Sequence, residues 1–373
     1  VGTSGSITTI TIQAKDANGN NRTSTSGAVV ASVTGANTAT ASVTDNLNGT
    51  YTATYTPTVA GTDNVAITLG GTAIGGSPYS SVVAPASLHH FAVTNTSGGS
   101  IASQTAGTSF NIQVTAQDAS NNTVTSFTGT VDLTSTGTLS AGSGTTTTFT
   151  AGVLASHAVT ISNTGTFTIT ATRTSGGTQT GTSNSFAVAA GAANPGTSTA
   201  SVPAGTAGSV TTITLQAKDA QGNNRTNATG ITAVAASVTG ANTATPSVTN
   251  NGNGTYTLTY TPTASGTDNV AITMDVGGGA VAISGSPYSS VVSAGAVSNF
   301  LVEAAGGGAI GAQTAGTSFN VKVTARDANN NTATAFTGTV TFTSTGTLSA
   351  GTGPSAAFPA GVLSSHALTL TNT

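Results

Sequence analysis

Charged side chains are scarce in this chain, and many of them gather at four short segments of the form Asp-x-x-x-Asn. In the first segment, Asp16, Asn18 and Asn20 place oxygen atoms at alternating positions, as at the start of a calcium loop. A calcium loop needs further carboxylates, whereas each of these segments has one. The pattern therefore favours an Asx turn, in which the aspartate caps a hairpin by bonding to its own backbone. Because Asp16 follows Ala14 by two residues, alternation places it on the inward face of its strand. The four aspartates are Asp16, Asp118, Asp219 and Asp327.

The histidines do not form a recognisable metal site. His157 and His366 occupy equivalent positions in repeated stretches, and His89 adjoins His90. Alternation puts His157 on the same face as Val159, near the end of a strand. Neither repeated histidine has another histidine nearby in sequence, so we expect them to be structural.

Lysines and serines offer no recognisable catalytic chemistry either. Intramolecular Lys–Asn crosslinks need a buried lysine beside a carboxylic acid, but Lys15, Lys218 and Lys322 fall on polar strand faces. No serine has the strand–turn–helix setting of a hydrolase nucleophile, and the single glutamate, Glu303, has no partner for glycosidase chemistry. We therefore assign no catalytic, cofactor-binding or metal-ligating residue, and we expect neither an enzyme nor a cofactor.

The composition excludes several classes of function. The chain has 7 Lys and Arg and a net charge of −3, whereas phosphate binding needs clustered basic residues, so nucleic acid is not an expected partner. No apolar run approaches the length of a membrane span. The absence of cysteine excludes disulfides and thiolate metal sites. A cysteine-free, threonine-rich chain with 5% charged residues is typical of an exported surface protein, and we expect an extracellular or cell-surface location.

The chain is built from two alternating kinds of repeat. The stretch that begins GTSGSITTITIQAKDANGNN at Gly2 returns from Gly205, and the different stretch TAGTSFNIQVTAQDASNNT at Thr105 returns from Thr314. Such self-similarity is the mark of an array of modules. We name the modules A1 (1–84), B1 (87–189), A2 (196–293) and B2 (297–373).

Strand signals recur throughout the modules. Tyr51, Ala53 and Tyr55 alternate with threonines, and Phe110 and Ile112 begin another alternating run. Period-2 alternation rich in β-branched residues, separated by Asn-Gly and Gly-Gly turns, indicates antiparallel strands. The predicted fold is all-β, a tandem series of immunoglobulin-like β-sandwiches. The segments between modules are very short, so we expect a stiff, elongated rod.

Segments of the inner modules have no counterpart in the outer ones. A2 has a leading segment, Gly196–Pro203, without a counterpart in A1, and B1 continues past Asn163 with strand-like stretches that B2 does not have. The simplest interpretation is a window from a longer array. The alternative is that a neighbouring chain donates the strands.

Two resemblances support this picture. Both A modules contain an NGTY-x-x-x-YTP strand, a following GTD strand start and a closing GSPY strand, which resemble the filamin-type immunoglobulin repeat. The Asp-x-x-x-Asn segments resemble the D-x-x-G-N hairpin of bacterial immunoglobulin-like domains in invasin- and intimin-type adhesins, although the proline that commonly follows is absent. These resemblances imply β-sandwiches in a surface protein and identify no ligand.

The expected function is structural. We expect the shaft of an extracellular filament, adhesin or surface layer that associates with copies of itself, because low charge reduces the repulsion between neighbouring shafts. A glycan- or receptor-binding adhesion module is an alternative, although tryptophan is absent and the tyrosines lie within strand patterns. An accessory region of a large secreted enzyme is another. Asn-x-Thr sequons also occur in the turns, as at Asn48 and Asn253.

Overall fold

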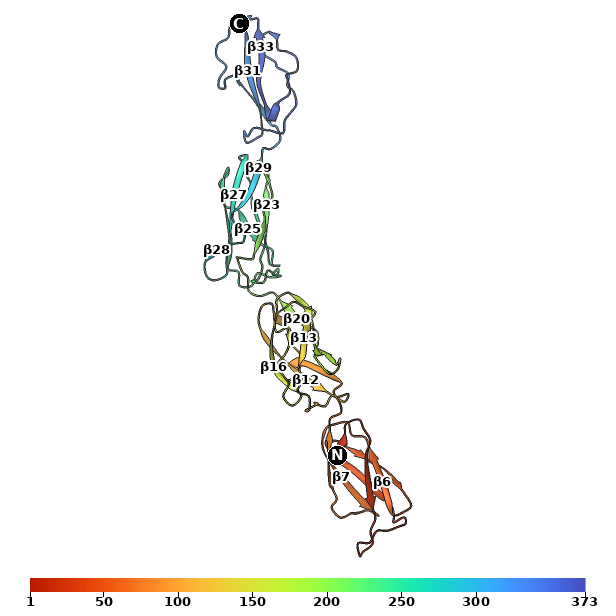
Figure 1. Cartoon of the computed structure of the whole chain (residues 1–373). Coiled ribbons are helices and arrows are strands. Elements are labelled where there is room, and N and C mark those ends of the chain that lie inside the picture. Colours follow the sequence, from red (N-terminus) through yellow and green to blue (C-terminus); the bar gives the residue numbers. More distant parts are fainter. Residues whose placement is uncertain (373) are drawn as a thin grey trace. The chain divides into compact units, whose positions relative to one another are not determined.

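The computed structural model describes residues 1–372, so Thr373, the last residue of predicted module B2, lies outside the described residues. The described chain forms two compact units, residues 1–189 and the part that begins at Ala190. Figure 1 shows the ribbon, coloured along the sequence. It is built almost entirely of strands, with one 3-10 turn, η1 (Pro359–Gly361). The predicted all-β class is confirmed. Within residues 1–372 no helix is long and apolar enough to span a membrane.

Predicted module A1 is a two-sheet sandwich. Its strands are β1 (Gly2–Thr3), β2 (Thr8–Gln13), β3 (Val29–Gly35), β4 (Ala39–Thr40), β5 (Ser42–Asp45), β6 (Thr50–Tyr55), β7 (Gly61–Leu69), β8 (Thr72–Ala73) and β9 (Tyr79–Ala84). One sheet has the order β1-β9-β7-β3-β4, with β8 beside β7, and the other has the order β2-β6-β5. Only the short β1–β9 pair is parallel. One hydrophobic core draws on both sheets, with Ile67 from one and Tyr51 from the other.

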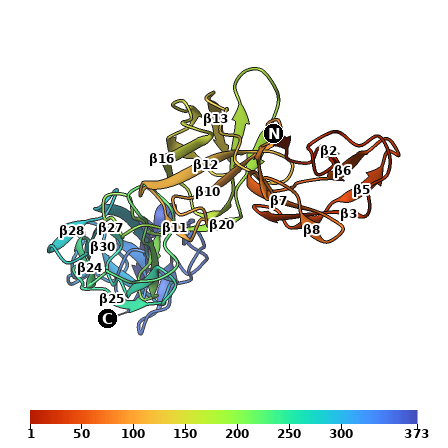
Figure 2. The ribbon, with the colours of Figure 1, turned by 90° about the horizontal axis from the view of Figure 1, so that it is seen from below.

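Predicted module B1 has the largest core cluster. Its strands are β10 (His90–Asn95), β11 (Gln104–Thr105), β12 (Phe110–Gln117), β13 (Val131–Ser135), β14 (Leu139–Ala141), β15 (Gly144–Thr145), β16 (Val153–Ile161), β17 (Gly165–Phe167), β18 (Ile169–Arg173), β19 (Thr180–Thr182) and β20 (Phe186–Ala189). They form the sheets β10-β12-β16-β14, β15-β13-β18-β19 and β11-β20-β17. Strands β10, β12 and β16 lie side by side (Figure 2). Inside, Phe127 packs edge to face against Phe91 and Phe149, and Phe91 is tilted against Phe149, with ring centroids 5.0 to 5.9 Å apart.

Predicted module A2 repeats the A1 arrangement, with a strand added at one sheet edge and only an isolated bridge, Val238 to Ala244, in the place of β4. Its strands are β21 (Thr199–Ser201), β22 (Gly205–Thr206), β23 (Thr211–Gln216), β24 (Ala233–Gly240), β25 (Ser247–Asn250), β26 (Thr255–Tyr260), β27 (Gly266–Asp275), β28 (Ala280–Ala282) and β29 (Tyr288–Ser293). The sheets are β21-β23-β26-β25 and β22-β29-β27-β24, with β28 beside β27. The additional strand, β21, comes from the leading segment Gly196–Pro203, and it pairs with β23.

Predicted module B2 has a single sheet. Its strands are β30 (Asn299–Ala304), β31 (Ser318–Arg326), β32 (Leu348–Ala350) and β33 (Val362–Leu370), in the order β30-β31-β33-β32. The core beneath this sheet includes Val321, Val323 and Phe358 and is smaller than the core of B1.

The alternation of apolar and polar residues along each strand determines which strand face points into the core. Tyr51, Ala53 and Tyr55 are buried, and the threonines between them are half-exposed. In β12, Ile112 and Val114 are fully buried. Alternate residues of a strand point to opposite faces, so this simple pattern predicts the core correctly.

Candidate functional site

The four Asp-x-x-x-Asn segments form Asx turns, as the sequence predicts. In the second turn, one carboxylate oxygen of Asp118 accepts hydrogen bonds from the backbone N–H groups of Ser120 and Asn122, each at 2.9 Å. The Asn122 side-chain amide also donates to this carboxylate. The turns that begin at Asp16, Asp219 and Asp327 have the same backbone pattern.

The second carboxylate oxygen of three of these aspartates holds the segment that precedes the module. Asp118 accepts a hydrogen bond from the N–H of Ala86 at 2.9 Å, and Asp327 accepts one from Gly295 at 2.8 Å. Asp219 does the same with Gly191 at 2.9 Å. A hydrogen bond to an ionised acceptor is stronger than a neutral one, so each turn fixes the entry of its own linker.

Asp16 differs from the other three aspartates, and the prediction that it faces inward is wrong. Asp118, Asp219 and Asp327 are at most 1% exposed, whereas Asp16 is exposed. The burial of the other three comes from the linker that covers each carboxylate. Strand alternation depends only on residues of the strand itself, so it predicts the same orientation for Asp16 as for its three equivalents.

Hydrogen bonding keeps these carboxylates ionised. Burial raises the pKa of Asp118, but the N–H groups of Ala86, Asn122 and Ser120 together outweigh burial and bring the pKa below its ordinary value. The same balance lowers the pKa of Asp219 and Asp327. For the exposed Asp16, the Asn20 side chain is the main cause of a lowered pKa.

In these turns the carboxylate is an anion surrounded by N–H hydrogen-bond donors. Around Asp16, the backbone N–H of Asn18 and both the backbone and side-chain N–H groups of Asn20 point at the carboxylate. A calcium loop instead turns several oxygen atoms toward one centre. Among residues 1–372, no group of three or more His, Cys, Asp or Glu side chains is placed to hold a metal ion.

The last residue of the second turn joins B1 to A1. The side-chain oxygen of Asn122 accepts a hydrogen bond from the N–H of Ala60 at 2.8 Å, and its amide donates to the Thr58 carbonyl at 2.8 Å and to Ser4 Oγ at 2.9 Å. Thr58 and Ala60 belong to the loop between β6 and β7 of A1. A single amide side chain therefore pairs with both a donor and an acceptor of the neighbouring backbone.

The chain builds the same joint a second time, between B2 and A2. Asn331 accepts a hydrogen bond from the N–H of Ser265 and donates to the carbonyl of Thr263, each at 2.8 Å. Ala207 replaces Ser4 in this copy, so the hydroxyl contact of the first joint has no equivalent. We call the pair of backbone contacts made by Asn122, and equally by Asn331, the Asn joint.

A buried polar cluster shapes the loop that receives each Asn joint. In A1, Asp63 is fully buried and accepts hydrogen bonds from the backbone and side chain of Asn37 and from the Tyr55 hydroxyl at 2.9 Å. The Asn37 side-chain oxygen in turn accepts the N–H groups of Thr58 and Val59, each at 2.9 Å. The loop is thus held in shape from within A1, which presents Thr58 and Ala60 to Asn122.

The equivalent cluster in A2 consists of Asp268, Asn242 and Tyr260. Tyr260 donates to Asp268 at 3.0 Å, and Asn242 accepts the N–H groups of Thr263 and Ala264. Burial, followed by the hydrogen bond to Asp63, raises the pKa of Tyr55. Burial is also the main cause of the raised pKa of Tyr260.

The sequence reasoning missed this cluster. The signal was present, because Asp63 stands in register with Val65 and Ile67 on the inward face of β7. An aspartate at a core position of an alternating strand requires buried partners. The partner asparagine lies in the repeated TGANTAT stretch, at Asn37 and again at Asn242.

The other residues that the sequence singled out, His157, His366 and Lys322, contact residues of their own module. His157 lies in the middle of β16 beside a register shift, not near a strand end as predicted, and its Nε2 is 3.1 Å from the carbonyl oxygen of Gly142. His366 makes the equivalent contact with Gly351 and stacks on Phe342. Lys322 lies 3.9 Å from Glu303 in a half-exposed ion pair.

Comparison with known families agrees with the geometry of the A modules. The sequence model of the Filamin/ABP280 repeat matches residues 2–80 and 190–289. These two segments are filamin-type repeats. The matched segments contain the buried clusters and the loops that receive the Asn joints, and residues 87–189 and 297–372 lie outside them.

Similar solved structures include bacterial surface proteins. FdeC, an Escherichia coli adhesin, is 26% identical, with 78% of this chain and 94% of that chain covered and a TM-score of 0.39. InvD of Yersinia pseudotuberculosis is 19% identical, with 74% and 91% covered and a TM-score of 0.33. Invasin, a bacterial integrin-binding protein, is 14% identical, with 99% and 74% covered and a TM-score of 0.37. No curated protein sequence matches this chain.

Proposed function

We propose that this chain is a non-enzymatic structural region of an extracellular surface protein. In this proposal it is an elongated shaft of four modules, 1–84, 87–189, 196–293 and 297–373. The observation that carries the proposal is the Asn joint, because the chain builds the same locked A-to-B connection twice. A chain that only tethered two ends would not need defined hydrogen bonds at its connections.

Each A–B pair acts as one mechanical unit in this proposal. Asp118 holds the linker at Ala86 while Asn122 holds the adjoining loop of A1, so one short turn fixes two points of the joint. Two separated points of attachment restrict both bending and rotation. The buried Asp63 cluster supports the second point from inside A1.

Self-association of shafts is part of the proposal. A charge content of 5% and a net charge of −3 leave little electrostatic repulsion between copies. Exposed valines on strands, such as Val82 and Val291, offer apolar contacts on otherwise threonine-rich faces. Sedimentation velocity over a range of concentrations tests this part separately, and a monomer at every concentration contradicts it.

Because the chain has no cysteine, two introduced thiols can be labelled selectively and the distance across the joint can be measured. Ser80→Cys in A1 and Ser156→Cys in B1 replace exposed serines with near-isosteric thiols, which can carry a pair of spin labels. Pulsed electron spin resonance on the full chain then gives the distribution of label distances. A rigid joint predicts a narrow distribution that broadens in Asn122→Ala and stays narrow in the control Ser120→Ala. A distribution that is already broad in the parent chain contradicts the rigid A–B unit.

Location is tested on the source cells. Immunogold electron microscopy with an antibody raised against this chain should label extensions or layers at the cell surface. Labelling confined to the cell interior contradicts the surface assignment, whatever the rigidity of the joint.

A further inference from the structure

Two adjacent histidines of predicted module B1 bring their ring nitrogens together. His89 Nδ1 lies 3.2 Å from His90 Nδ1, and the two rings are nearly perpendicular, at 84°. His89 is exposed and His90 is half-exposed, and neither ring has another hydrogen-bond partner among residues 1–372. Two nitrogen lone pairs that face each other repel unless a proton or a cation lies between them. We call this pair the His dyad.

The backbone around the His dyad explains why the two rings converge. Adjacent residues of one strand point to opposite faces, but strand β10 begins at His90, so His89 precedes the strand. The N–H of His89 donates to the carbonyl of Gln117 at 2.8 Å, and His90 pairs with Gln117 in the ladder between β10 and β12. Strand β12 therefore fixes the backbone of the dyad, while both side chains lie at the surface.

Predicted module B2 does not have this pair. Ser298 and Asn299 occupy the equivalent positions at the start of β30. The N–H of Ser298 donates to the carbonyl of Arg326 at 2.7 Å, and Asn299 pairs with Arg326, as the dyad does with Gln117. The backbone thus takes the same form with other side chains, so the fold does not require the two histidines.

The separation of the two dyad nitrogens suits a single metal ion. Imidazole nitrogens bind Zn²⁺ at about 2.0–2.1 Å, so two of them on a tetrahedral ion lie about 3.3 Å apart. The dyad nitrogens are 3.2 Å apart. Because both rings lie at the surface, small torsional rotations can direct the two lone pairs at one ion. Imidazole also suits Cu²⁺ and Ni²⁺, whereas Ca²⁺ takes oxygen ligands.

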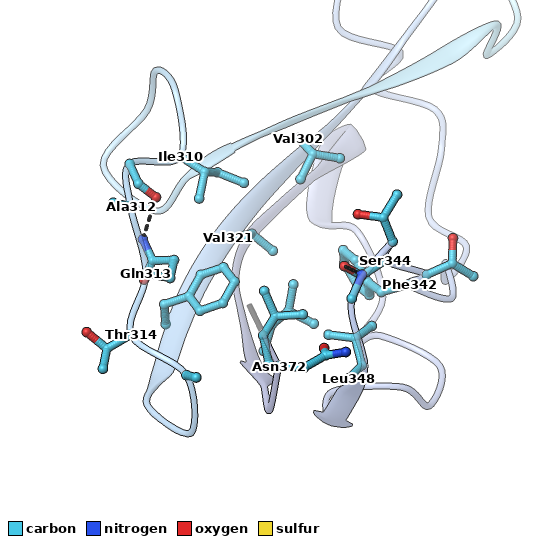
Figure 3. A pocket seen from close by; sticks show the side chains of 18 residues that line it. Val302, Ile310, Ala312, Gln313, Thr314, Val321, Phe342, Ser344, Leu348 and Asn372 are labelled. Carbon is cyan, nitrogen blue, oxygen red and sulfur yellow. Dashed lines mark hydrogen bonds between the residues drawn. The ribbon is translucent and has the colours of Figure 1, made fainter.

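Other parts of the described chain do not offer such a pair. His157 and His366 each stand apart from other histidines, with Nε2 3.1 Å from a backbone carbonyl oxygen. A groove of about 750 Å³ beside the B2 sheet has no His, Asp or Glu in its lining, and Figure 3 shows Ile310, Val321 and Phe342 around it. Within residues 1–372, paired imidazole ligands therefore occur at the His dyad alone.

We propose that the His dyad is a surface site for a divalent transition-metal ion, with Nδ1 of both histidines as ligands. Without metal, one Nδ1 carries the proton that lies between the two rings. On binding, this proton moves through solvent to Nε2 of the same ring, and the ion takes its place between two neutral imidazoles. Two protein ligands leave further positions on the ion open to water or to another molecule. The site goes beyond the proposed shaft function and does not depend on it.

Isothermal titration calorimetry with ZnCl₂, and separately with CuCl₂, tests the site on the full chain without an affinity tag. The expected result is one ion bound per chain. The double variant His89→Ser, His90→Asn introduces the side chains that B2 has on the same backbone, so it should fold. It should weaken binding by at least about tenfold, since loss of a hydrogen bond to a metal ligand alone can cost that much. The control His157→Gln should leave binding unchanged.

Magnetic resonance locates the ion and counts its ligands. Paramagnetic Cu²⁺ should broaden the amide signals of Phe91 and Gln117 and leave those of their B2 equivalents, Phe300 and Arg326, sharp. Pulsed electron spin resonance of the Cu²⁺ complex should show two coordinated imidazoles in the parent chain and one in either single variant, His89→Ser or His90→Asn. Absence of binding, binding that keeps its affinity in the double variant, or broadening centred away from the dyad overturns the proposal.

Discussion

Replacing Asn122 with alanine should loosen the joint between A1 and B1 by a calculable amount. The Asn122 amide has two hydrogens but lies within hydrogen-bonding distance of four acceptors: Thr58 O, Ser4 Oγ and both oxygens of Asp118. We therefore count one donated bond across the joint and one within the turn. The bond accepted from Ala60 also crosses the joint.

Two hydrogen bonds across the joint contribute about 2 kcal/mol, at about 1 kcal/mol net for each. Local opening of the loop should become easier by this amount, which corresponds to a fall of about 30-fold in the hydrogen-exchange protection of the Ala60 amide. The assay is amide exchange by nuclear magnetic resonance on the full chain. The amides of the β7 core strand should keep their protection, because their bonds lie within A1.

Two control variants distinguish loss of the Asn joint from disturbance of the turn. Ser120→Ala leaves intact the backbone N–H that donates to Asp118, so exchange at Ala60 should not change. Asn331→Ala should release Ser265 and leave Ala60 protected. Unchanged exchange at Ala60 in Asn122→Ala, or an equal effect from Ser120→Ala, refutes the reasoning.

Three further predictions concern the groups around the joint. Tyr55→Phe removes a hydrogen bond to the buried Asp63 carboxylate and should lower the free energy of unfolding of A1 by about 2 kcal/mol in a urea titration; no change contradicts a contribution of this bond to stability. Because the pKa values of Asp118 and Asp327 are lowered in the folded chain, their contribution is present above the ordinary aspartate pKa and is lost as the pH falls through the folded-state value. Protection of the Ala86 amide should accordingly fall below about pH 4, and a constant protection factor down to pH 2 contradicts this. Millimolar calcium or a chelator should shift the melting temperature by less than about 1 °C, because the carboxylates are already held by N–H donors; a larger rise with calcium shows a metal site.

The strand faces could be predicted because the rule behind them is local. Tyr51, Ala53 and Tyr55 alternate with threonines, and the pleat of a strand directs alternate side chains to opposite faces wherever the strand is placed. The Asx turns could be predicted for the same reason, since Asp118 bonds to backbone groups two and four residues ahead. Repetition of both features along the chain gave the modular organisation.

The joint could not be predicted in this way. Asn122 and Ala60 are 62 residues apart, and nothing within the turn indicates that its amide reaches another module. The burial of Asp118, Asp219 and Asp327 has a similar origin, because the linker that covers each of them is not part of the local turn. The inward register of Asp63 in β7 indicated that this aspartate needs buried partners. That Asn37 is one of these partners is visible only in the folded loop.

The sequence by itself determined that the chain is all-β, that two different stretches repeat alternately along it, and that Asp-x-x-x-Asn segments form capped turns. Each of these depends on neighbours within a few residues, so composition and spacing suffice. Only the tertiary structure decided that Asn122 and Asn331 tie neighbouring modules together and that buried aspartates shape the loops they meet. Such contacts form between segments far apart in sequence, where the free energy depends on which backbone groups the fold brings within about 3 Å of each other.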